Sequence, residues 1–392
     1  MRKKICIITG SRAEWGLFYP LAKEIRRQKS DFALQIIATG AHFSQRHGLT
    51  YKEICRDGFK ITKAVPLTVS QDTEQGILRA FGGAVISLGK ALRSARPDLV
   101  ILLGDRFETF AAAVACLFEK IPVAHIHGGE LTEGSLDDMM RHSVTKLAHI
   151  HFTSHEEHKK RVIQMGEDPS RVFCVGALAL DNINGRKLLS KKTLEDKLRF
   201  KLGKDTLMVT FNPPTASGKL KIERQFKNLL DALDELKSIK VIFTKSSPDI
   251  HSKTIARLSD RYISSRSKKC IVRSSLGREV YLSLLKYTAA VVGNSSSGLI
   301  EAPSLGVPTV NIGDRQKGRL CARSVINCEP EKLLILKSIR KALGKNFREE
   351  CKKVKNPYDK GSASRSIVSV LKRTRIDSDF IKKRFHDLWR YE

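Results

Sequence analysis

The sequence predicts an α/β protein made of two domains, each a doubly wound parallel sheet, that face a cleft. The chain has 392 residues, which suits two domains of roughly 150–200 residues each. Short runs rich in Val and Ile alternate with longer amphipathic stretches along most of the chain. Within residues 182–204 this alternation gives way to a polar, basic segment. We place the domain boundary there.

The apolar runs are predicted to be strands buried on both faces. Continuous apolar strands that alternate with helices are typical of parallel sheets covered by helices on both sides. This is the pattern of Rossmann-like domains. The predicted strands lie within residues 5–10, 34–40, 98–105, 122–129, 149–154 and 172–177, and within 206–213, 240–247, 270–275, 289–297 and 307–314.

Helices are expected where apolar residues recur at helical spacing. The clearest of these stretches are residues 17–28, 77–94, 109–120 and 143–148. Residues 377–392 also predict a helix with one apolar stripe, which Asp377 or Ser378 can cap. The expected domains are therefore 1–182 and 205–376, joined by a linker at 183–204, with the terminal helix packing back across them.

The net charge of +30 lies mainly after residue 150. A nucleic acid or an anionic membrane surface would be one reason for such an excess. The basic residues are dispersed, however, and 7 Tyr and 2 Trp offer few rings for stacking on bases. We therefore expect a solvated basic surface that also meets a small anionic ligand, with no specific nucleic acid partner.

Cysteine usage and hydropathy predict a cytoplasmic protein with no membrane partner. The 8 cysteines are scattered, with no CxxC pair, which favours buried free thiols in a reducing compartment. The opening segment MRKKICIITG has too short an apolar run for a signal peptide. No apolar run reaches the roughly 18 residues of a membrane-spanning helix.

Two neighbouring predicted strands end at charged residues flanked by glycine. The first is followed by GDR (104–106), which contains Asp105 and Arg106, and the second by HGGE (127–130). Because parallel strands present their carboxyl ends at one edge of the sheet, Asp105 and Glu130 are expected to face one ligand crevice.

The segment after HGGE holds the densest set of titratable side chains. Asp137 and Arg141 lie four residues apart, on one face of a predicted helix. They form either a routine surface ion pair or a part of the same site. The nearby histidines lack a tight ligand spacing such as HExxH, so no metal is expected.

Two turns offer anion-binding groups. TGSRAEWG (9–16) joins the first strand to the first helix and contains Arg12, although it matches neither a dinucleotide nor a P-loop motif. The segment 293–319 is richer, because hydroxyl groups and free N–H groups at a helix start suit a phosphate. Glu301 in that helix could accept hydrogen bonds from a ribose diol or simply complement the helix dipole.

Four segments together resemble the hydrolysing UDP-N-acetylglucosamine 2-epimerase family. They are TGSRAEWG, GDRFET, HIHGGE with DDMMRHSVTKLAHIHF, and GNSSSGLIEAPSLGVPTVNIGDRQKGR, and the likeness covers about residues 5–370 in the family's order. The resemblance implies the two-domain GT-B fold and a reaction that needs no cofactor or metal. A base removes the C2 proton as UDP leaves C1, and a 2-acetamidoglucal then takes up water. The products are UDP and a free manno-configured sugar, a precursor of nonulosonic acids.

The resemblance also implies roles for single residues. Asp105, Asp137 and Arg141 match catalytic positions, and either His127 or Glu130 supplies a second catalytic group, since some relatives carry Glu at the position of His127. Asn212 stands where the family often has His, and Ser247, before Asp249, where it often has Asn. The expected substrate and UDP contacts are Arg12, Arg106, Asn212, Ser247, Asp249, Ser295, Ser296, Glu301 and Arg315.

Several alternatives stay open on the sequence alone. The sugar nucleotide is either UDP-N-acetylglucosamine or a UDP-2,4-diacetamido-trideoxyglucose analogue, because both share the UDP end and the chemistry at C2. A glycosyltransferase of the same fold and a catalytically silent UDP-sugar binder are the competing functions. We expect a homo-oligomer, either a dimer or a tetramer.

Overall fold

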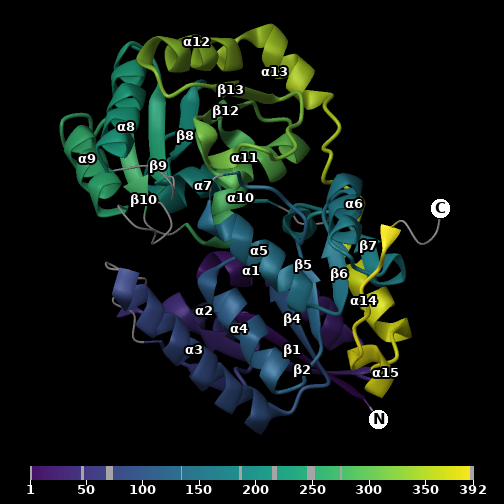
Figure 1. Ribbon diagram of the computed structural model, residues 1–392. Coiled ribbons are helices and arrows are strands. Elements are labelled where there is room, and N and C mark those ends of the chain that lie inside the picture. Colours follow the sequence, from purple (N-terminus) through teal and green to yellow (C-terminus); the bar gives the residue numbers. More distant parts are fainter. Residues whose placement is uncertain are drawn as a thin grey trace. The chain divides into compact units, whose positions relative to one another are not determined.

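The computed structural model describes residues 2–45, 48–67, 74–133, 135–184, 188–213, 219–244, 252–273 and 276–388. The chain divides into two compact units (Figure 1). The first comprises Met1–Glu130, Asp137–Asn182 and Lys360–Glu392, and the second comprises Leu131–Leu136 and Ile183–Asp359. No described helix is long and apolar enough to cross a membrane.

The first unit is a parallel sheet of 7 strands in the order β3-β2-β1-β4-β5-β6-β7. Helices lie on both of its faces (Figure 1). Its strands are β1 (Lys3–Thr9), β2 (Phe32–Thr39), β3 (Lys63–Val65), β4 (Leu99–Leu103), β5 (Val123–Ile126), β6 (Ile150–Thr153) and β7 (Val172–Cys174). Its helices are α1 (Arg12–Arg27), α2 (Tyr51–Arg56), α3 (Glu74–Ala95), α4 (Phe107–Phe118), α5 (Leu136–Leu147), α6 (Glu156–Gln164), α14 (Ala363–Arg373) and α15 (Ser378–Ile381).

The second unit is a parallel sheet of 6 strands in the order β10-β9-β8-β11-β12-β13. Its strands are β8 (Thr206–Thr210), β9 (Lys240–Thr244), β10 (Cys270–Arg273), β11 (Ala290–Gly293), β12 (Thr309–Ile312) and β13 (Val325–Cys328). Its helices are α7 (Lys191–Leu198), α8 (Lys219–Asp234), α9 (Ser252–Ser264), α10 (Gly277–Tyr287), α11 (Ser296–Ile300), α12 (Lys332–Leu343) and α13 (Lys345–Lys352).

Strand alternation explains why each sheet is buried on both sides. In β4, Ile101 and Leu103 join the core cluster that contains α1, while Val100 and Leu102 join the cluster beneath α3 and α4. Successive strand residues point to opposite faces, so an unbroken apolar run fills two layers at once. The predicted fold class is thereby confirmed: both units are doubly wound and Rossmann-like.

Each sheet reverses its winding once, and that place is where such sheets bind ligands. In the first unit the reversal lies between β1 and β4, and in the second it lies between β8 and β11. The turns that follow these four strands are the segments that the sequence singled out: 9–16 and 104–106 in the first unit, and 211–213 and 294–297 in the second.

The structure divides the C-terminal part of the chain differently from the sequence prediction. Residues from Lys360 onward belong to the first unit, whereas we expected the second domain to extend to residue 376. The apolar face of α14, which includes Ile367 and Leu371, is buried in the first unit's core. Asp181 also caps this helix, since its carboxylate accepts hydrogen bonds from the N–H groups of Ala363 at 3.0 Å and Ser364 at 2.6 Å.

The predicted terminal helix is much shorter than expected. It covers only Ser378–Ile381 and begins at its predicted cap, where Asp377 accepts from the N–H of Phe380 at 2.9 Å. Beyond it, Lys383 extends toward the end of α5 and donates to the carbonyl oxygens of Lys146 and Ala148. These contacts favour an extended chain over a continued helix. Residues 389–392 lie outside the described part.

Two further differences concern short segments. The edge strands β3 and β13 were missed, because runs of only 3 and 4 residues, most of them partly or fully exposed, carry little hydrophobic pattern. Residues Leu131–Leu136 belong to the second unit, although they fall within the predicted first domain. In that loop the N–H of Glu133 donates to the carbonyl of Lys317 at 3.2 Å.

Candidate active site

Asp105 lies in the turn after β4 and is held by Arg141 of α5. The side chain of Arg141 is 1% exposed and donates to the carboxylate of Asp105, which is 23% exposed. Burial lowers the pKa of Arg141, but the negative charges of Asp105, Glu130 and Asp138 outweigh it and raise that pKa. Asp105 therefore presents a partly accessible carboxylate with one side fixed by a permanent cation.

The structure adds an acid to the predicted Asp137–Arg141 pair. Arg141 donates to Asp138 at 3.1 Å and to the carbonyl oxygen of Glu130 at 2.8 Å. Asp137 precedes Asp138 in the first turn of α5 and is half-buried. The sequence reasoning missed Asp138, although its spacing of three from Arg141 is also a helical neighbour relation.

A buried histidine fixes the turn that carries Asp105. His125 of β5 meets the carbonyl oxygen of Gly104 at 2.8 Å and the hydroxyl of Thr145 at 3.1 Å. Burial lowers the pKa of His125 to about 3, so the ring is neutral and one nitrogen donates to Gly104. This residue positions the turn and was not among the predicted site residues.

The sequence left His127 and Glu130 as alternatives for the second catalytic group. In the structure their side chains are hydrogen-bonded to each other. His127 Nδ1 lies 3.1 Å from Glu130 Oε1, and its Nε2 accepts from the N–H of Leu178 at 3.3 Å. The same Glu130 oxygen accepts from Ser154 at 2.7 Å. Both side chains are buried. The backbone of His127 has a φ of 67°, a value that residues other than glycine rarely adopt. The HGGE turn is thus fixed by the contact between His127 and Glu130 and by hydrogen bonds from Leu178 and Ser154.

The turn after β1 brings Arg12 to the same edge of the first unit's sheet. Arg12 is the first residue of α1 and is partly exposed. Arg106, after β4, pairs with the buried Glu108 at 3.2 Å. The three predicted segments of the first unit therefore lie at the carboxyl ends of β1, β4 and β5, as the sequence indicated.

In the second unit an amide clamp joins the ends of β8 and β11. The side chain of Asn294 accepts from the N–H of Asn212 at 2.6 Å and donates to the carbonyl of Asn212 at 2.8 Å. Gly293 permits this approach, since a Cβ there would lie 1.9 Å from the carbonyl oxygen of Thr210. Asn212 is 5% exposed, and both its N–H and its carbonyl are used in the clamp.

Ser295, Ser296 and Arg315 lie beside this clamp. Ser295 caps α11, and Ser295 and Ser296 are both partly exposed. Arg315 donates to the carbonyl of Asn294 at 3.1 Å, and Gln316 donates to the same oxygen at 2.9 Å. A guanidinium and two hydroxyl groups at one turn suit a phosphate group.

Glu301 follows α11 and has an unusual environment for a carboxylate. Burial raises its pKa to about 7, and a hydrogen bond with Ser297 offsets part of this effect. Tyr281 of α10 lies near Glu301. Burial and the charge of Glu301 raise the pKa of Tyr281. Tyr281 was not predicted, because nothing in its helical pattern distinguishes it from a core residue.

Two predicted contacts, Ser247 and Asp249, lie outside the described residues. Among the residues that the structure describes, no group of three or more His, Cys, Asp or Glu side chains could hold a metal ion. His125 and His151 instead contact protein groups, as in the 2.9 Å contact of His151 with Glu167.

The fold defines the class first: two Rossmann-like units in a single chain, the GT-B-like architecture. Solved structures share this architecture. A UDP-N-acetylglucosamine 2-epimerase of Neisseria meningitidis, solved with UDP-N-acetylglucosamine bound, has a TM-score of 0.80 and 19% identity, covering 95% of this chain and 100% of its own. A putative UDP-N-acetylglucosamine 2-epimerase of Listeria monocytogenes has a TM-score of 0.78 and 18% identity, covering 99% of each chain.

The family follows from the sequence itself. A family model described as UDP-N-acetylglucosamine 2-epimerase matches residues 23–372, so the chain belongs to that family. A "GDP/UDP-N,N'-diacetylbacillosamine 2-epimerase (hydrolyzing)" of Campylobacter jejuni is 44% identical over 84% of this chain and 85% of its own. A "polysialic acid biosynthesis protein" of Escherichia coli is 38% identical over 98% of this chain and 96% of its own. A "UDP-N,N'-diacetylbacillosamine 2-epimerase (hydrolyzing)" of Legionella pneumophila is 32% identical over 98% of this chain and 99% of its own.

Proposed function

We propose that this protein is a hydrolysing 2-epimerase that converts a UDP-2-acetamido sugar to UDP and the free manno-configured sugar. Its product would be a precursor of a nonulosonic acid. The observation that carries the proposal is the partly exposed Asp105, fixed by the buried Arg141, in a chain that belongs to the 2-epimerase family. We place the activity in the cytoplasm, since all 8 cysteines are free thiols.

The first unit is assigned the proton transfers. Asp105 is held by Arg141 without being covered by it, so it suits removal of the C2 proton or its return. Asp137 and Asp138, at the start of α5, are candidates for the second transfer. The bonded pair His127–Glu130 is a third candidate, because the histidine can pass a proton to the carboxylate at 3.1 Å. Arg12 and Arg106 are assigned to the substrate's anionic groups.

The second unit is assigned the nucleotide. Ser295, Ser296 and Arg315 would hold the phosphates, and Glu301 would accept hydrogen bonds from the ribose hydroxyl groups. The backbone clamp between Asn212 and Asn294 supports this role, because it fixes the turn on which both serines lie. Ser247 and Asp249 remain proposed contacts on the sequence resemblance alone.

Among the substrates that the sequence left open, we propose the 2,4-diacetamido-trideoxy sugar. The names of the relatives at 44% and 32% identity both specify N,N'-diacetylbacillosamine, which is a sugar of this kind. The relative at 38% identity is named for polysialic acid instead, so UDP-N-acetylglucosamine is the competing substrate.

The test is incubation of the purified protein with each UDP-sugar in D2O. We expect release of UDP, a manno-configured product and deuterium at C2, because the removed proton exchanges with solvent. A glycosyltransferase would release UDP only with an acceptor, and a silent binder would release none. Retention of the original hydrogen at C2 would contradict the elimination step.

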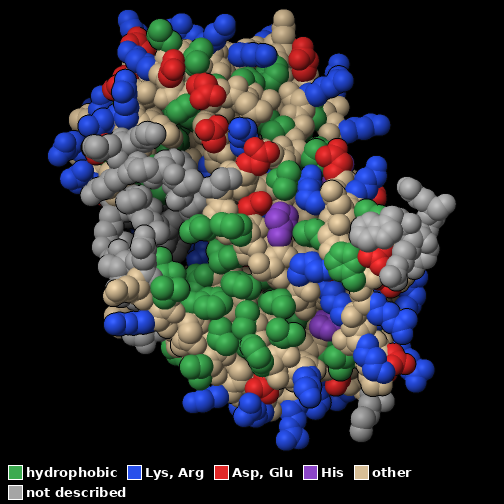
Figure 2. Space-filling view, viewed as in Figure 1, with side chains coloured by type: hydrophobic (Ala, Val, Ile, Leu, Met, Phe, Trp, Pro, Cys, Tyr) green, Lys and Arg blue, Asp and Glu red, His purple; other side chains and the backbone are tan. Residues whose placement is uncertain are grey.

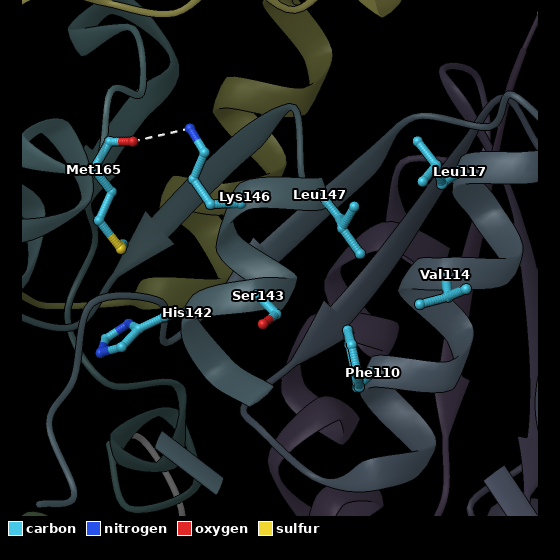
Figure 3. A pocket seen from close by; sticks show the side chains of 8 residues that line it. All are labelled: Phe110, Val114, Leu117, His142, Ser143, Lys146, Leu147 and Met165. Carbon is cyan, nitrogen blue, oxygen red and sulfur yellow. Dashed lines mark hydrogen bonds between the residues drawn. The ribbon is translucent and has the colours of Figure 1, made fainter. Parts of the chain in front are cut away.

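We further propose that the protein is a homodimer through the outer face of α3, α4 and α5. Hydrophobic side chains gather on this part of the first unit (Figure 2). Leu78, Ile86 and Phe118 are 70%, 62% and 77% exposed. Between α4 and α5 lies an open apolar hollow, lined by Phe110, Val114, Leu117, His142, Ser143, Lys146, Leu147 and Met165 (Figure 3). A two-fold interface requires one surface that fits itself, and this face offers both protruding apolar side chains and a hollow.

Light scattering during size-exclusion chromatography tests the dimer. We expect the wild type to have twice the chain mass of 43.9 kDa and Phe118→Asp to have the single mass. Leu333→Asp is the matched control, because Leu333 of α12 is 74% exposed but lies in the second unit. A monomeric wild type, or a dimer that Phe118→Asp leaves intact, would exclude this interface.

A further inference from the structure

Glu14 of α1 is a buried carboxyl group that the proposed reaction does not use. It is 6% exposed and lies among the turns that follow β1, β2 and β4. One of its oxygens accepts from the N–H of Gly10 at 2.5 Å and from the hydroxyl of Thr9 at 3.3 Å. The other oxygen lies 3.4 Å from the hydroxyl of Thr109 in α4.

The hydroxyl of Thr109 shows which protonation state fits. It lies within hydrogen-bond distance of Glu14 and also 3.3 Å from the carbonyl oxygen of Leu103. A threonine has one proton to donate. If Glu14 is ionised, its carboxylate oxygen and the carbonyl oxygen of Leu103 are both acceptors, and Thr109 can donate to only one of them. If Glu14 is protonated, it donates to Thr109, and Thr109 donates to Leu103.

On the other side of Glu14, Thr50, His42 and Thr9 form a series of hydrogen bonds that leads to its carboxyl group. His42 Nε2 lies 3.1 Å from the Thr9 hydroxyl, and its Nδ1 lies 3.0 Å from the hydroxyl of Thr50. Burial lowers the pKa of His42 to about 4, so the ring is neutral. Thr50 can then donate to His42, His42 to Thr9 and Thr9 to Glu14. When Glu14 carries its proton, both of its oxygens and the carbonyl of Leu103 take part in this chain of hydrogen bonds. When Glu14 is ionised, the single Thr109 proton reaches either Glu14 or Leu103, but not both.

The charges around Glu14 also favour the protonated form. Glu108 of α4 packs so closely that a Cβ on Gly10 would meet its side chain at 3.3 Å. Burial is the main cause that raises the pKa of Glu14 to about 7, and the charge of Glu108 adds to it, while the Gly10 N–H, Arg106 and Thr9 act in the opposite direction. Arg106 pairs with Glu108 at 3.2 Å, so the cation next to Glu14 already has a carboxylate partner.

We propose that Glu14 is a protonated positioning residue that fastens the turn bearing Arg12 to the turn bearing Asp105. The chain of hydrogen bonds runs from Thr50 through Glu14 to the carbonyl of Leu103, two residues before Asp105. Glu14 touches no reacting atom in this role. It acts through the geometry of the two turns, and its catalytic consequence rests on the proposed function.

Ionisation of Glu14 should loosen this connection. Its pKa in the folded protein lies above the ordinary value of 4.5, so the folded state holds the proton more tightly than the unfolded state. The stability that this group contributes is fully present below pH 4.5 and is lost as the pH rises through about 7. At pH 8 a group with this pKa is about nine-tenths ionised, which predicts an approximately tenfold loss of any activity that needs the protonated form.

The test compares the wild type with Glu14→Gln, in which a neutral amide can donate to Thr109 and accept from Gly10. As the pH rises from 5.5 to 8, we expect the denaturant concentration at the unfolding midpoint to decrease more for the wild type than for Glu14→Gln. We also expect kcat/KM of Glu14→Gln to match the wild type at pH 6 and to exceed it about tenfold at pH 8. Glu24→Gln, elsewhere on α1, should follow the wild type at every pH.

If Glu14→Gln does not fold, the pair Thr109→Val and Thr109→Ser decides. Without the hydroxyl group, Thr109→Val should lose stability and kcat/KM at a lower pH than the wild type does. Thr109→Ser, which keeps the hydroxyl group, should lose them at the same pH as the wild type. Identical pH dependence of wild type and Glu14→Gln, or of the two Thr109 variants, would overturn the proposal. If the wild type releases no UDP from either sugar, the proposed function fails, while the denaturant midpoints still decide the state of Glu14.

Discussion

At the scale of single residues, Asp105 is the side chain most open to a decisive substitution. We expect Asp105→Asn to lower turnover by at least ~100-fold, the lower range for a lost acid–base group, while UDP binding stays nearly unchanged. The strand offers its own control in Asp98, which accepts from the N–H of Lys4 at 2.7 Å at the opposite end of β4. Asp98→Asn should leave turnover within a few-fold of wild type. Steady-state kinetics and calorimetry with UDP measure both variants, and unchanged turnover in Asp105→Asn would remove this residue from the proton transfers.

Glu301 should make UDP binding depend on pH. Its pKa of about 7 in the free protein means that ribose hydroxyl groups, which donate to the ionised form, bind more weakly as the pH falls through 7. We expect UDP affinity to fall up to about fivefold between pH 7 and pH 6, because the ionised fraction falls from about one-half to about one-eleventh. The phosphate of UDP also titrates near pH 6, so the informative quantity is the difference from Glu301→Gln in calorimetry. Parallel curves for the two proteins would exclude a ribose contact.

At the scale of elements, the C-terminal segment should stabilise α5, the helix that carries Arg141. Lys383 donates to the carbonyls of Lys146 and Ala148 and pairs with Glu167 at 2.7 Å. Cations at the C-terminal end of a helix also complement its dipole. We expect Lys383→Ala to destabilise the first unit by about 1–3 kcal/mol, since it leaves buried carbonyl groups without this donor.

Lys382→Ala is the matched control for that experiment. Lys382 neighbours Lys383 but is 72% exposed and pairs only with Asp379 among the interactions described for it. A surface pair of this kind contributes little. Thermal unfolding should therefore distinguish the two variants, and equal melting temperatures would mean that the segment does not support α5.

At the scale of the whole molecule, the charge of +30 should produce binding to nucleic acids without specificity. The bound phosphates release counterions, so affinity should fall steeply with salt. We expect any complex with DNA or RNA to disappear by roughly 200 mM salt and to show no preference for sequence or structure. Fluorescence anisotropy with unrelated oligonucleotides measures this, and a specific complex that survives such salt would require another function for the basic surface.

The sequence by itself determined the fold class, the sheet interiors and the turns that carry the proposed site. These depend on local signals: apolar runs form strands, small residues end them, and parallel strands end at one edge. Asp105, His127 and Glu130 of the first unit, and Ser295 and Arg315 of the second, could be found because each follows a strand within the chain's own pattern.

Only the tertiary structure decided which of these side chains meet and what surrounds them. The pairing of Arg141 with both Asp105 and Asp138, the bond between His127 and Glu130, and the closure around Glu14 join elements far apart in the sequence. The same holds for α14, which packs in the first unit although the whole of the second unit precedes it in the sequence. Burial, and with it the protonation of Glu14 and Glu301, is set by neighbours from several elements at once, and no single stretch of sequence contains that information.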